Sequence, residues 1–536
     1  MAATKERLLQ TKTVEAYLSE YLKLGENLVD PPKMKLVLPD GINRLGARDV
    51  AVTTSVQCYA PGIAPMRQRQ DGRSEAIADS TLEAGHHTTR QHVSYTWLVQ
   101  GVSRSATHDI FHSHPFYNSE QQSQRYVEAV SGSYLVPTGL SGEQRQLYTE
   151  TADLANRAYF KLLELLKPEV GRREKAMHPR GKWAEVIVAE RTIKASQEIA
   201  RYVLPIAQKT NYYHDLSELQ LLRLFRASQM PHFTDEARYV IAQMIVSIAK
   251  EDPTIIKDLR VPINDFTTQA PTQFGTRFTR EVFDTHLGGR QSLLISFPQN
   301  GRGVILAAAR RFLGGGLDLS DSQVLGLVMD PAKNHLLADM YDVGMFDYLT
   351  DCLRLVSATF ITRLSHTADS QRQRHRRTHG VTLPVAQMYN STPDYIIPKV
   401  VRETPQLREA YEKILGRVYE GVNKCLDSGM SREQALLLLP NAHVIKVTET
   451  GDLFDWFHRL RQRLCFLAQE EFFFISCEQA LQLRGVLPEA KSMFLAPCGI
   501  RSAAGIRPRC PEDKRWCGQP VFNWEELEEY TAKRLI

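Results

Sequence analysis

The sequence has no run of about eighteen apolar residues and no low-complexity tract. The first absence excludes a membrane-spanning helix, and the second, with 43% hydrophobic and 24% charged residues, excludes a disordered or fibrous chain. The N-terminus lacks the compact apolar segment and small-residue cleavage site of a secretory signal, so we expect a cytoplasmic protein. The 66 basic residues nearly balance the 61 acidic ones, which gives no indication of nucleic-acid binding.

Cysteine is also scarce, with 8 residues in 536, which indicates a reducing compartment. Cys498, Cys510 and Cys517 lie in a tail where Gly and Pro flank them, but their spacing is not that of paired CxxC zinc knuckles. Free buried thiols are the favoured interpretation, and a structural zinc is the alternative.

The chain resembles itself at a domain-sized interval. Twice, a helix-like run ends in Leu-Pro and an arginine follows in a second helix-like run. SQEIARYVLP ends at Pro205 and precedes Arg226, whereas SREQALLLLP ends at Pro440 and precedes Arg461 and Arg463. An interval of about 235 to 250 residues indicates a gene duplication rather than a solenoid, and a chain of this length is expected to hold more than one core.

Composition suggests where the units begin and end. We expect a first unit at 1–255, a linker at 256–270, a second unit at 271–490 and a cysteine-containing tail at 491–536. VSYTWLV alternates as a strand does, and helical spacing runs through residues 142–167. The predicted fold class is therefore α+β, with two similar units that each have a small sheet and long packed helices.

Residues 84–127 carry a more specific pattern. His86 and Thr88 fit a Gly-His-x-Thr box, and Ser123, Arg125 and Tyr126 fit the end of the signature RHRxxSxNxxSxRY. In these motifs the segment resembles the flavin-dependent thymidylate synthase family. EIARYVLP and LLRLFR resemble the family's later arginine segments, and WFHRLRQRLCFLAQEE resembles its C-terminal helix. The resemblance covers most of residues 45–255 and, more loosely, 340–485.

The resemblance implies roles for individual residues. It implies that the phosphate of the substrate is held by Ser123, Arg125, Arg201 and Arg226, since arginine offers paired, charge-assisted hydrogen bonds. It implies that FAD contacts a second set, two of them from the second unit: His86, Thr88, His114, Arg461 and Arg463. No metal site is expected, because the spacing of His86, His87 and His92 matches no standard zinc site.

The signature also departs from the family. Its opening Arg-His-Arg, which reaches the flavin, falls on Ser113-His114-Pro115. In the second unit the same register falls on Thr362-Arg363-Leu364, while a literal triplet occurs later, at Arg374-His375-Arg376. The later triplet is either a shifted signature or an accident of an arginine-rich loop, and we favour the accident.

The resemblance implies methylation at carbon 5 of the uracil of dUMP, with FAD as cofactor, methylenetetrahydrofolate as carbon donor and NADPH as reductant. The family works as a tetramer with sites between subunits, so we expect a homo-oligomer in which two chains supply four units. The alternatives are another pyrimidine nucleotide as substrate and a non-catalytic paralogue that keeps the fold. The basic run at 372–377 leaves room for RNA binding, although a lone charge cluster is usually only solvated.

Overall fold

The computed structural model describes most of the chain. It covers residues 12–37, 47–57, 61–63, 65, 76–77, 79–80, 83–85, 87–178, 184–230, 232–259, 276–314, 318–382, 385, 389–512 and 515–536. No helix among these residues is long and apolar enough to cross a membrane.

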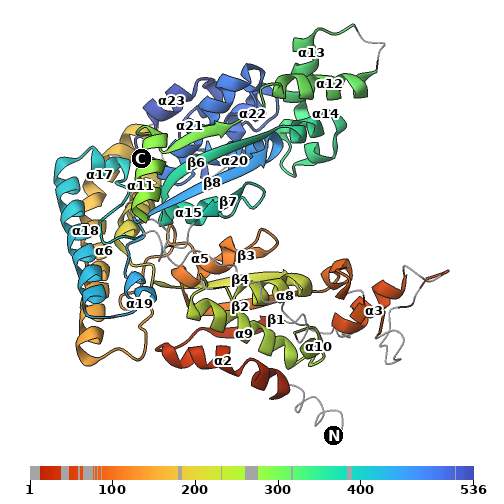
Figure 1. Ribbon diagram of the computed structural model, residues 1–536. Helices are drawn as coiled ribbons and strands as arrows, with labels where there is room; N and C mark the ends of the chain where they lie inside the picture. Colours follow the sequence, from red (N-terminus) through yellow and green to blue (C-terminus); the bar gives the residue numbers. More distant parts are fainter. Residues whose placement is uncertain are drawn as a thin grey trace.

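Two four-stranded antiparallel sheets organise the described chain (Figure 1). The first has the order β1-β2-β4-β3 and consists of β1 Lys33–Val37, β2 Ser94–Ser103, β3 Asn118–Gln121 and β4 Lys209–Ser217. The second has the matching order β5-β6-β8-β7 and consists of β5 Ser292–Ser296, β6 Ser357–Ser365, β7 His379–Thr382 and β8 Val444–Asp452. The shared strand order shows that the two units have the same topology.

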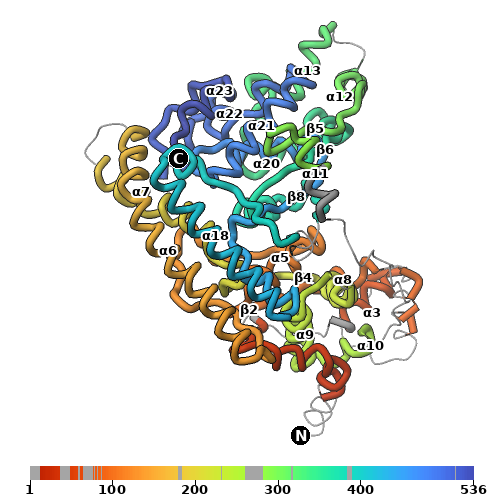
Figure 2. Tube along the Cα trace, turned by 60° about the vertical axis from the view of Figure 1, so that its left-hand side comes forward, coloured from red at the N-terminus to blue at the C-terminus, as the bar shows by residue number. Residues whose placement is uncertain are grey.

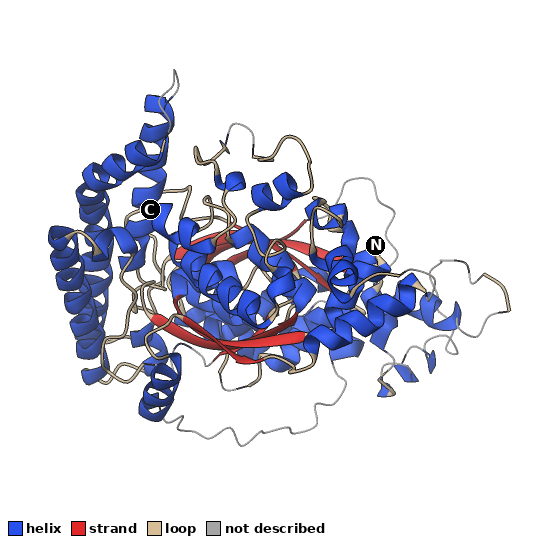
Figure 3. Cartoon of the chain, turned by 90° about the horizontal axis from the view of Figure 1, so that it is seen from above, coloured by secondary structure: helices blue, strands red, loops and turns tan. Residues whose placement is uncertain are grey.

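Helices follow the strands at equivalent places in the two units. The equivalent pairs are α5 Arg104–His112 with α15 His366–Arg372, α6 Gly142–Met177 with α18 Pro405–Asp427, α8 Glu218–Ala227 with α20 Leu453–Arg463, and α9 Asp235–Ala249 with α21 Glu470–Val486. The first unit also has α7 Ala184–Ala200 and η3 Arg201–Val203. Its N-terminal half includes α2 Ser19–Lys23, η1 Leu24–Asn27, α3 Ala47–Gln57 and η2 His87–Gln91. Viewed from above, blue helices lie beside and between the red strands of the two sheets (Figure 3).

The remaining elements lie between the units, in the second unit and in the tail. They are α10 Ile255–Leu259, α11 Thr276–Leu287, α12 Gly301–Leu313, α13 Asp321–Met329, η4 His335–Ala338, η5 Val343–Phe346, α14 Tyr348–Asp351, η6 Cys352–Leu355, α17 Lys399–Arg402, α19 Arg432–Leu436, η7 Pro488–Ala490, α22 Pro497–Ala503, η9 Val521–Asn523 and α23 Leu527–Lys533.

The two Leu-Pro segments lie against each other at the centre of the molecule. Pro205 and Pro440 form an antiparallel bridge. The N–H of Ile206 donates to the carbonyl of Leu439 at 2.9 Å, and the equivalent N–H of Asn441 donates to the carbonyl of Leu204 at 2.8 Å. The predicted equivalence of Pro205 and Pro440 is confirmed, and the reciprocal bonds show that the units meet through a pseudo-two-fold axis.

A buried helix cap is also repeated in both units. Ser103 caps α5, and both its N–H, at 2.7 Å, and its hydroxyl donate to the carboxylate of Glu236 on α9. Ser365 caps α15 and makes the same two bonds to Glu471 on α21, again at 2.7 Å from the N–H. A buried carboxylate is tolerated when it accepts several hydrogen bonds, so each cap fixes the start of a helix against its own unit's core.

Three clusters of buried side chains hold the fold together. One packs under the first sheet, around Trp97, and one packs under the second sheet, around Trp456. The third joins the units along α6 and α18, which lie side by side in the ribbon and in the tube (Figures 1 and 2). The tail packs into the second unit's core through Trp524 and Tyr530, which contact the ring of Phe466.

The predicted α+β class with two similar units is confirmed. The proposed boundaries remain predictions: residues 260–275 lie outside the described part, and α10 occupies the residues before them. The sequence analysis did not predict β4 and β8. The helix-like runs that end at Arg226 and Arg463 extend back to residues 215 and 451, so they include the last residues of both strands.

The contact between α6 and α18 generates a matched stability test. A Cβ on Gly421 of α18 would lie 2.3 Å from the Thr151 hydroxyl oxygen of α6, whereas a Cβ on Gly416 would meet nothing within 4 Å. We expect Gly421→Ala to lower the free energy of unfolding by about 1–2 kcal/mol, because a β-branched neighbour on a helix has little freedom to move. We expect Gly416→Ala to raise it by about 0.5–1 kcal/mol through helix propensity. Urea unfolding of both variants measures this, and equal effects would contradict the packing described.

Candidate functional site

A cavity of about 590 Å³ lies where the two units and the tail meet. The first unit contributes Arg125, Tyr126 and one side of α7, and the second contributes the segment from Gln462 to Glu470. The tail supplies the cations Arg515 and Arg534 and the C-terminal residue Ile536. Arg125 and Arg463, which the sequence analysis assigned to substrate and flavin, therefore share one cavity.

Arg125 crosses from the first unit to the second. Its Nη2 donates to the carbonyl of Leu467 at 2.8 Å, and its Nε donates to the carboxylate of Glu198 on α7. Burial alone would lower the pKa of Arg125, but the charge of Glu198 outweighs it and the pKa is raised. Ser123 accepts a hydrogen bond from the N–H of Arg125 at 3.2 Å, so it helps shape the turn that presents this arginine.

Arg463 is a half-buried cation without an acidic partner in the described contacts. Its Nε donates to Nε2 of His375 at 2.6 Å, and its Nη1 donates to Gln371 at 3.2 Å. Burial, followed by the charges of Arg125 and Arg374, lowers the pKa of Arg463 to about 9. A half-buried cation beside other cations is unfavourable, and an anion in the cavity would relieve this.

A second buried pair of arginines lies beside this cavity. Arg201, in η3, is 4% exposed, and its Nη2 has no hydrogen-bond partner among the described residues. Burial lowers the pKa of Arg104 to about 9, with further contributions from Arg201 and Arg374. Excess positive charge therefore extends from the cavity to the place where residues 113–118 of the first unit meet residues 374–376 of the second, called here the two signature segments.

The literal Arg-His-Arg triplet lies in the second unit's counterpart of the loop that holds residues 113–115 in the first unit. Residues 374–376 lie between α15 and β7, as residues 113–115 lie between α5 and β3. The residue Arg363, which the alternative register selects, lies on β6 and pairs with Asp394 at 2.5 Å. The register that selects Thr362-Arg363-Leu364 was therefore wrong, because Arg363 lies on a strand and not in the loop after α15. Whether the triplet is a displaced signature stays a prediction, because the equivalent caps Ser103 and Ser365 align Ser113 with His375 and not with Arg374.

The two signature segments also touch each other. Arg376 donates to the side-chain oxygen of Asn118 at 3.3 Å and lies over the ring of Tyr117, 4.8 Å from its centroid. His114 and Arg376 line a small cavity of about 30 Å³. Burial, with Arg223 adding to it, lowers the pKa of His114 to about 4. The first unit's surviving histidine thus lies beside the second unit's arginines.

The other predicted residues lie elsewhere. Arg226 is on α8, which packs against η2 and α9, and it does not line the 590 Å³ cavity. Arg461 pairs with Asp342 and donates to the carbonyl of Asp339 at 3.0 Å. Thr88 is exposed on η2, and His86 lies outside the described residues. The structure joins none of the three described residues, Arg226, Arg461 and Thr88, to the cavity, and the predicted roles of all four residues are not tested by it.

The mirror image of the site has lost its basic residues. With the numbering offset that relates Pro205 to Pro440, Arg463 corresponds to Ser228 and Arg201 corresponds to Leu436. Ser228 is buried, and its hydroxyl donates to the carbonyl of Phe225 at 2.6 Å. The two units have therefore diverged, and each keeps a different part of one site.

Comparison with known proteins agrees with this arrangement. The family model described as "Thymidylate synthase complementing protein" matches residues 42–254 and again residues 294–489. The chain belongs to this family. The two matches correspond to the two units.

Individual members of the family are distant. A flavin-dependent thymidylate synthase of Clostridium tetani is 26% identical over 212 residues, which are 39% of this chain and 80% of that protein. One from Mycobacterium sp. (strain JLS) is 29% identical over 199 residues, 36% of this chain and 74% of that protein. A solved structure, the UMP/dUMP methylase PolB from Streptomyces cacaoi bound with 5-Br dUMP, has a TM-score of 0.30 at 18% identity and covers 38% of this chain and 93% of that chain.

The sequence analysis missed several residues of the cavity. Glu198 is three residues before Arg201 in EIARYVLP, and Glu470 directly follows the C-terminal helix segment's Ala-Gln pair. Both are carboxylates in a basic cavity, and a signal for them existed only in their closeness to the predicted arginines. The three tail cysteines do not form a metal-binding group among the described residues, and the seven described cysteines are free thiols.

The charge of Glu470 generates a pH-dependent prediction. Burial raises the pKa of Glu470 to about 7, although Arg534 opposes the shift. Glu470 is therefore neutral below about pH 7 and negative above it, so sulfate, whose charge is constant, should bind about fivefold more weakly at pH 8 than at pH 6. Glu470→Gln should remove this difference. Calorimetric titration with sulfate checks it, and an unchanged pH profile in the variant would contradict the assignment.

Proposed function

We propose that this chain is a flavin-dependent enzyme that methylates a uracil nucleotide at carbon 5, with dUMP as the first substrate to test. The observation that carries the proposal is the cavity in which Arg125 of the first unit meets Arg463 of the second. Both belong to segments that match the family, and the family's other members named above are flavin-dependent thymidylate synthases.

The phosphate of the nucleotide is assigned to Arg125 and Arg463. A dianion placed between the two guanidinium groups offsets the repulsion between cations that helps to lower the pKa of Arg463. When the phosphate binds, Arg125 either gives up its hydrogen bond to Glu198 or donates to Glu198 and the phosphate at the same time, through different N–H groups. Arg201, directly behind Glu198, adds positive charge from a side chain that has a free donor within the described structure. The predicted role of Ser123 in holding the phosphate is kept as part of the proposal, whereas Arg226, which does not line this cavity, is proposed for a second site.

FAD is assigned to the junction of the two signature segments. Arg374 is exposed, and no partner for its guanidinium is found in the described part of the chain, so it is available to an anionic cofactor. His114 and Arg376 lie beside it, and Arg463 connects this junction to the cavity through His375. The flavin would supply the redox chemistry of the methylation, and the residues named here bind and orient it.

Methylenetetrahydrofolate as carbon donor and NADPH as reductant complete the proposal on the resemblance to the family. A dimer of this chain, with four units, is the assembly we propose for the same reason. In such a dimer a second site could form between the two chains, and we propose that site for Arg226, Arg461, Thr88 and His86. A non-catalytic paralogue that binds nucleotide is the alternative. The ion pair between Arg125 and Glu198 favours it, because Glu198 occupies part of the guanidinium that a substrate phosphate would need.

Substitution of the two arginines tests the phosphate site. We expect Arg125→Ala and Arg463→Ala each to weaken dUMP binding at least thirtyfold, because removing one partner of a buried charge pair costs roughly 2–5 kcal/mol. Arg417→Ala, an exposed arginine of α18, is the matched control and should bind as the parent does. Calorimetry measures all three, and parent-like affinity in Arg463→Ala would overturn the composite site.

The flavin assignment has its own test in one loop. Arg374→Ala should weaken FAD binding at least tenfold, since it removes a free guanidinium at the proposed site. Arg377→Ala in the same loop, whose guanidinium contacts the sulfur of Met345 at 3.7 Å, should leave it unchanged. Fluorescence quenching of FAD gives both affinities. A protein that takes up no FAD would favour the non-catalytic paralogue.

A further inference from the structure

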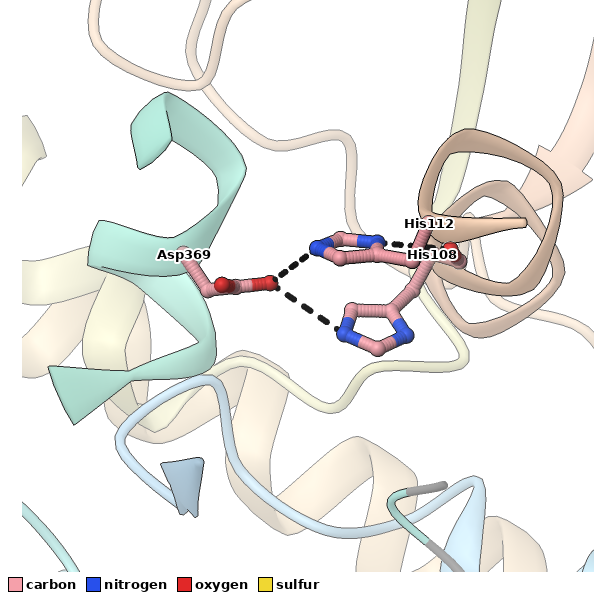
Figure 4. A group of neighbouring side chains, drawn as sticks. All are labelled: His108, His112 and Asp369. Carbon is pink, nitrogen blue, oxygen red and sulfur yellow. Dashed lines mark hydrogen bonds and ion pairs between the residues drawn. The ribbon is translucent and has the colours of Figure 1, made fainter. Parts of the chain in front are cut away.

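Two histidines and one aspartate converge at the boundary between the units (Figure 4). His108 and His112 are one helical turn apart on α5, so their side chains share a face. Asp369 comes from α15 of the other unit. One oxygen of Asp369 lies 3.2 Å from Nε2 of His108 and 2.7 Å from Nε2 of His112. The three ligand atoms lie within 4.8 Å of one another.

The hydrogen bonds around this group leave its central atoms unsatisfied. Nδ1 of His112 lies 2.7 Å from the backbone carbonyl of His108, a contact that requires the proton to be on Nδ1. If the ring of His112 is neutral, its Nε2 carries a lone pair that faces the oxygen of Asp369. Both atoms are then hydrogen-bond acceptors, and no proton lies between them. Both Nε2 atoms and this oxygen lack a hydrogen-bond partner among the described residues.

We propose that this group binds one divalent transition-metal ion, for which Zn²⁺ is the best match. A cation bound between the three atoms would accept a lone pair from each of them and so remove the unfavourable contact between acceptors. Two imidazoles and a carboxylate are a donor set that Zn²⁺ uses with a water in the fourth position. Ligands around a tetrahedral zinc are about 3.3 Å apart, so His108 already fits and His112 must move by about half an ångström.

The surroundings orient the ligands as metal sites require. The backbone carbonyl of His108 fixes the His112 ring, and Nε of Arg372 donates to the other oxygen of Asp369 at 2.6 Å. Arg372 also faces Glu449 at 3.9 Å, which offsets its charge. A cavity of about 20 Å³, lined by both histidines, Gln121 and His366, has room for one water.

Such an ion would connect the two units close to the proposed flavin residues. It would tie α5 to α15 directly before the loop that carries residues 374–376. The site is independent of the proposed methylation and uses none of the residues assigned to nucleotide or flavin. It replaces the expectation of no metal with a specific site whose third ligand comes from the other unit.

The test uses the full chain after chelator treatment, titrated with Co²⁺ and then Zn²⁺. We expect one equivalent of Co²⁺ to bind with the visible absorption of a tetrahedral site and without a thiolate charge-transfer band, and Zn²⁺ to displace it. The absence of that thiolate band separates the site from adventitious binding by the eight cysteines. A parent protein that binds no stoichiometric ion, so that the group is a protonated ion pair only, would overturn the proposal.

Variants identify the ligands. His108→Ala and Asp369→Asn should weaken Co²⁺ binding at least a hundredfold, whereas His286→Ala, an exposed histidine of α11, should leave it unchanged. Circular dichroism shows whether each variant is folded. If one ligand variant does not fold, the other and the parent spectrum still decide the matter, and parent-like binding in a folded His108→Ala would refute the site.

Discussion

The reciprocal hydrogen bonds between the two Leu-Pro segments are the constraint on which the rest of the structure depends. They place Pro205 against Pro440 and bury the backbone of both segments, which must find partners within the protein. Each unit supplies the partner for the other. The segments also precede β4 and β8, so the bonds fix how the two sheets face each other.

Once two copies are joined in this way, they are free to diverge. A single unit no longer needs every residue of the site, since the partner copy is always present in the same chain. Arg125 and Arg463 remain in different units, while Ser228 replaces the mirror copy of Arg463. The first unit keeps residues that fit the end of the signature, Ser123 to Tyr126, while a literal Arg-His-Arg triplet occurs only in the second unit, at Arg374 to Arg376.

The sequence predicted the duplication because the pattern of Leu-Pro followed by an arginine occurs twice. It predicted the fold class and the long helices because helical spacing is a local property of the sequence. It did not predict β4 and β8. In β4 the buried positions are Thr210, Tyr212, His214 and Leu216, an alternation that two polar side chains obscure. The sequence also named Arg463 without its contacts to Gln371 and His375, because those residues lie about 90 positions away along the chain. The His108 and His112 spacing was visible, but Asp369 is far away in the sequence and only the fold brings it near.

The central claim is that one nucleotide site is built from both units. A crystal structure of the chain with dUMP tests it most directly. The account predicts that the phosphate lies in the 590 Å³ cavity within hydrogen-bond distance of both Arg125 and Arg463, with Glu198 displaced from Arg125 or sharing it. A phosphate bound within one unit alone, or near Arg226 and away from Arg463, would contradict it.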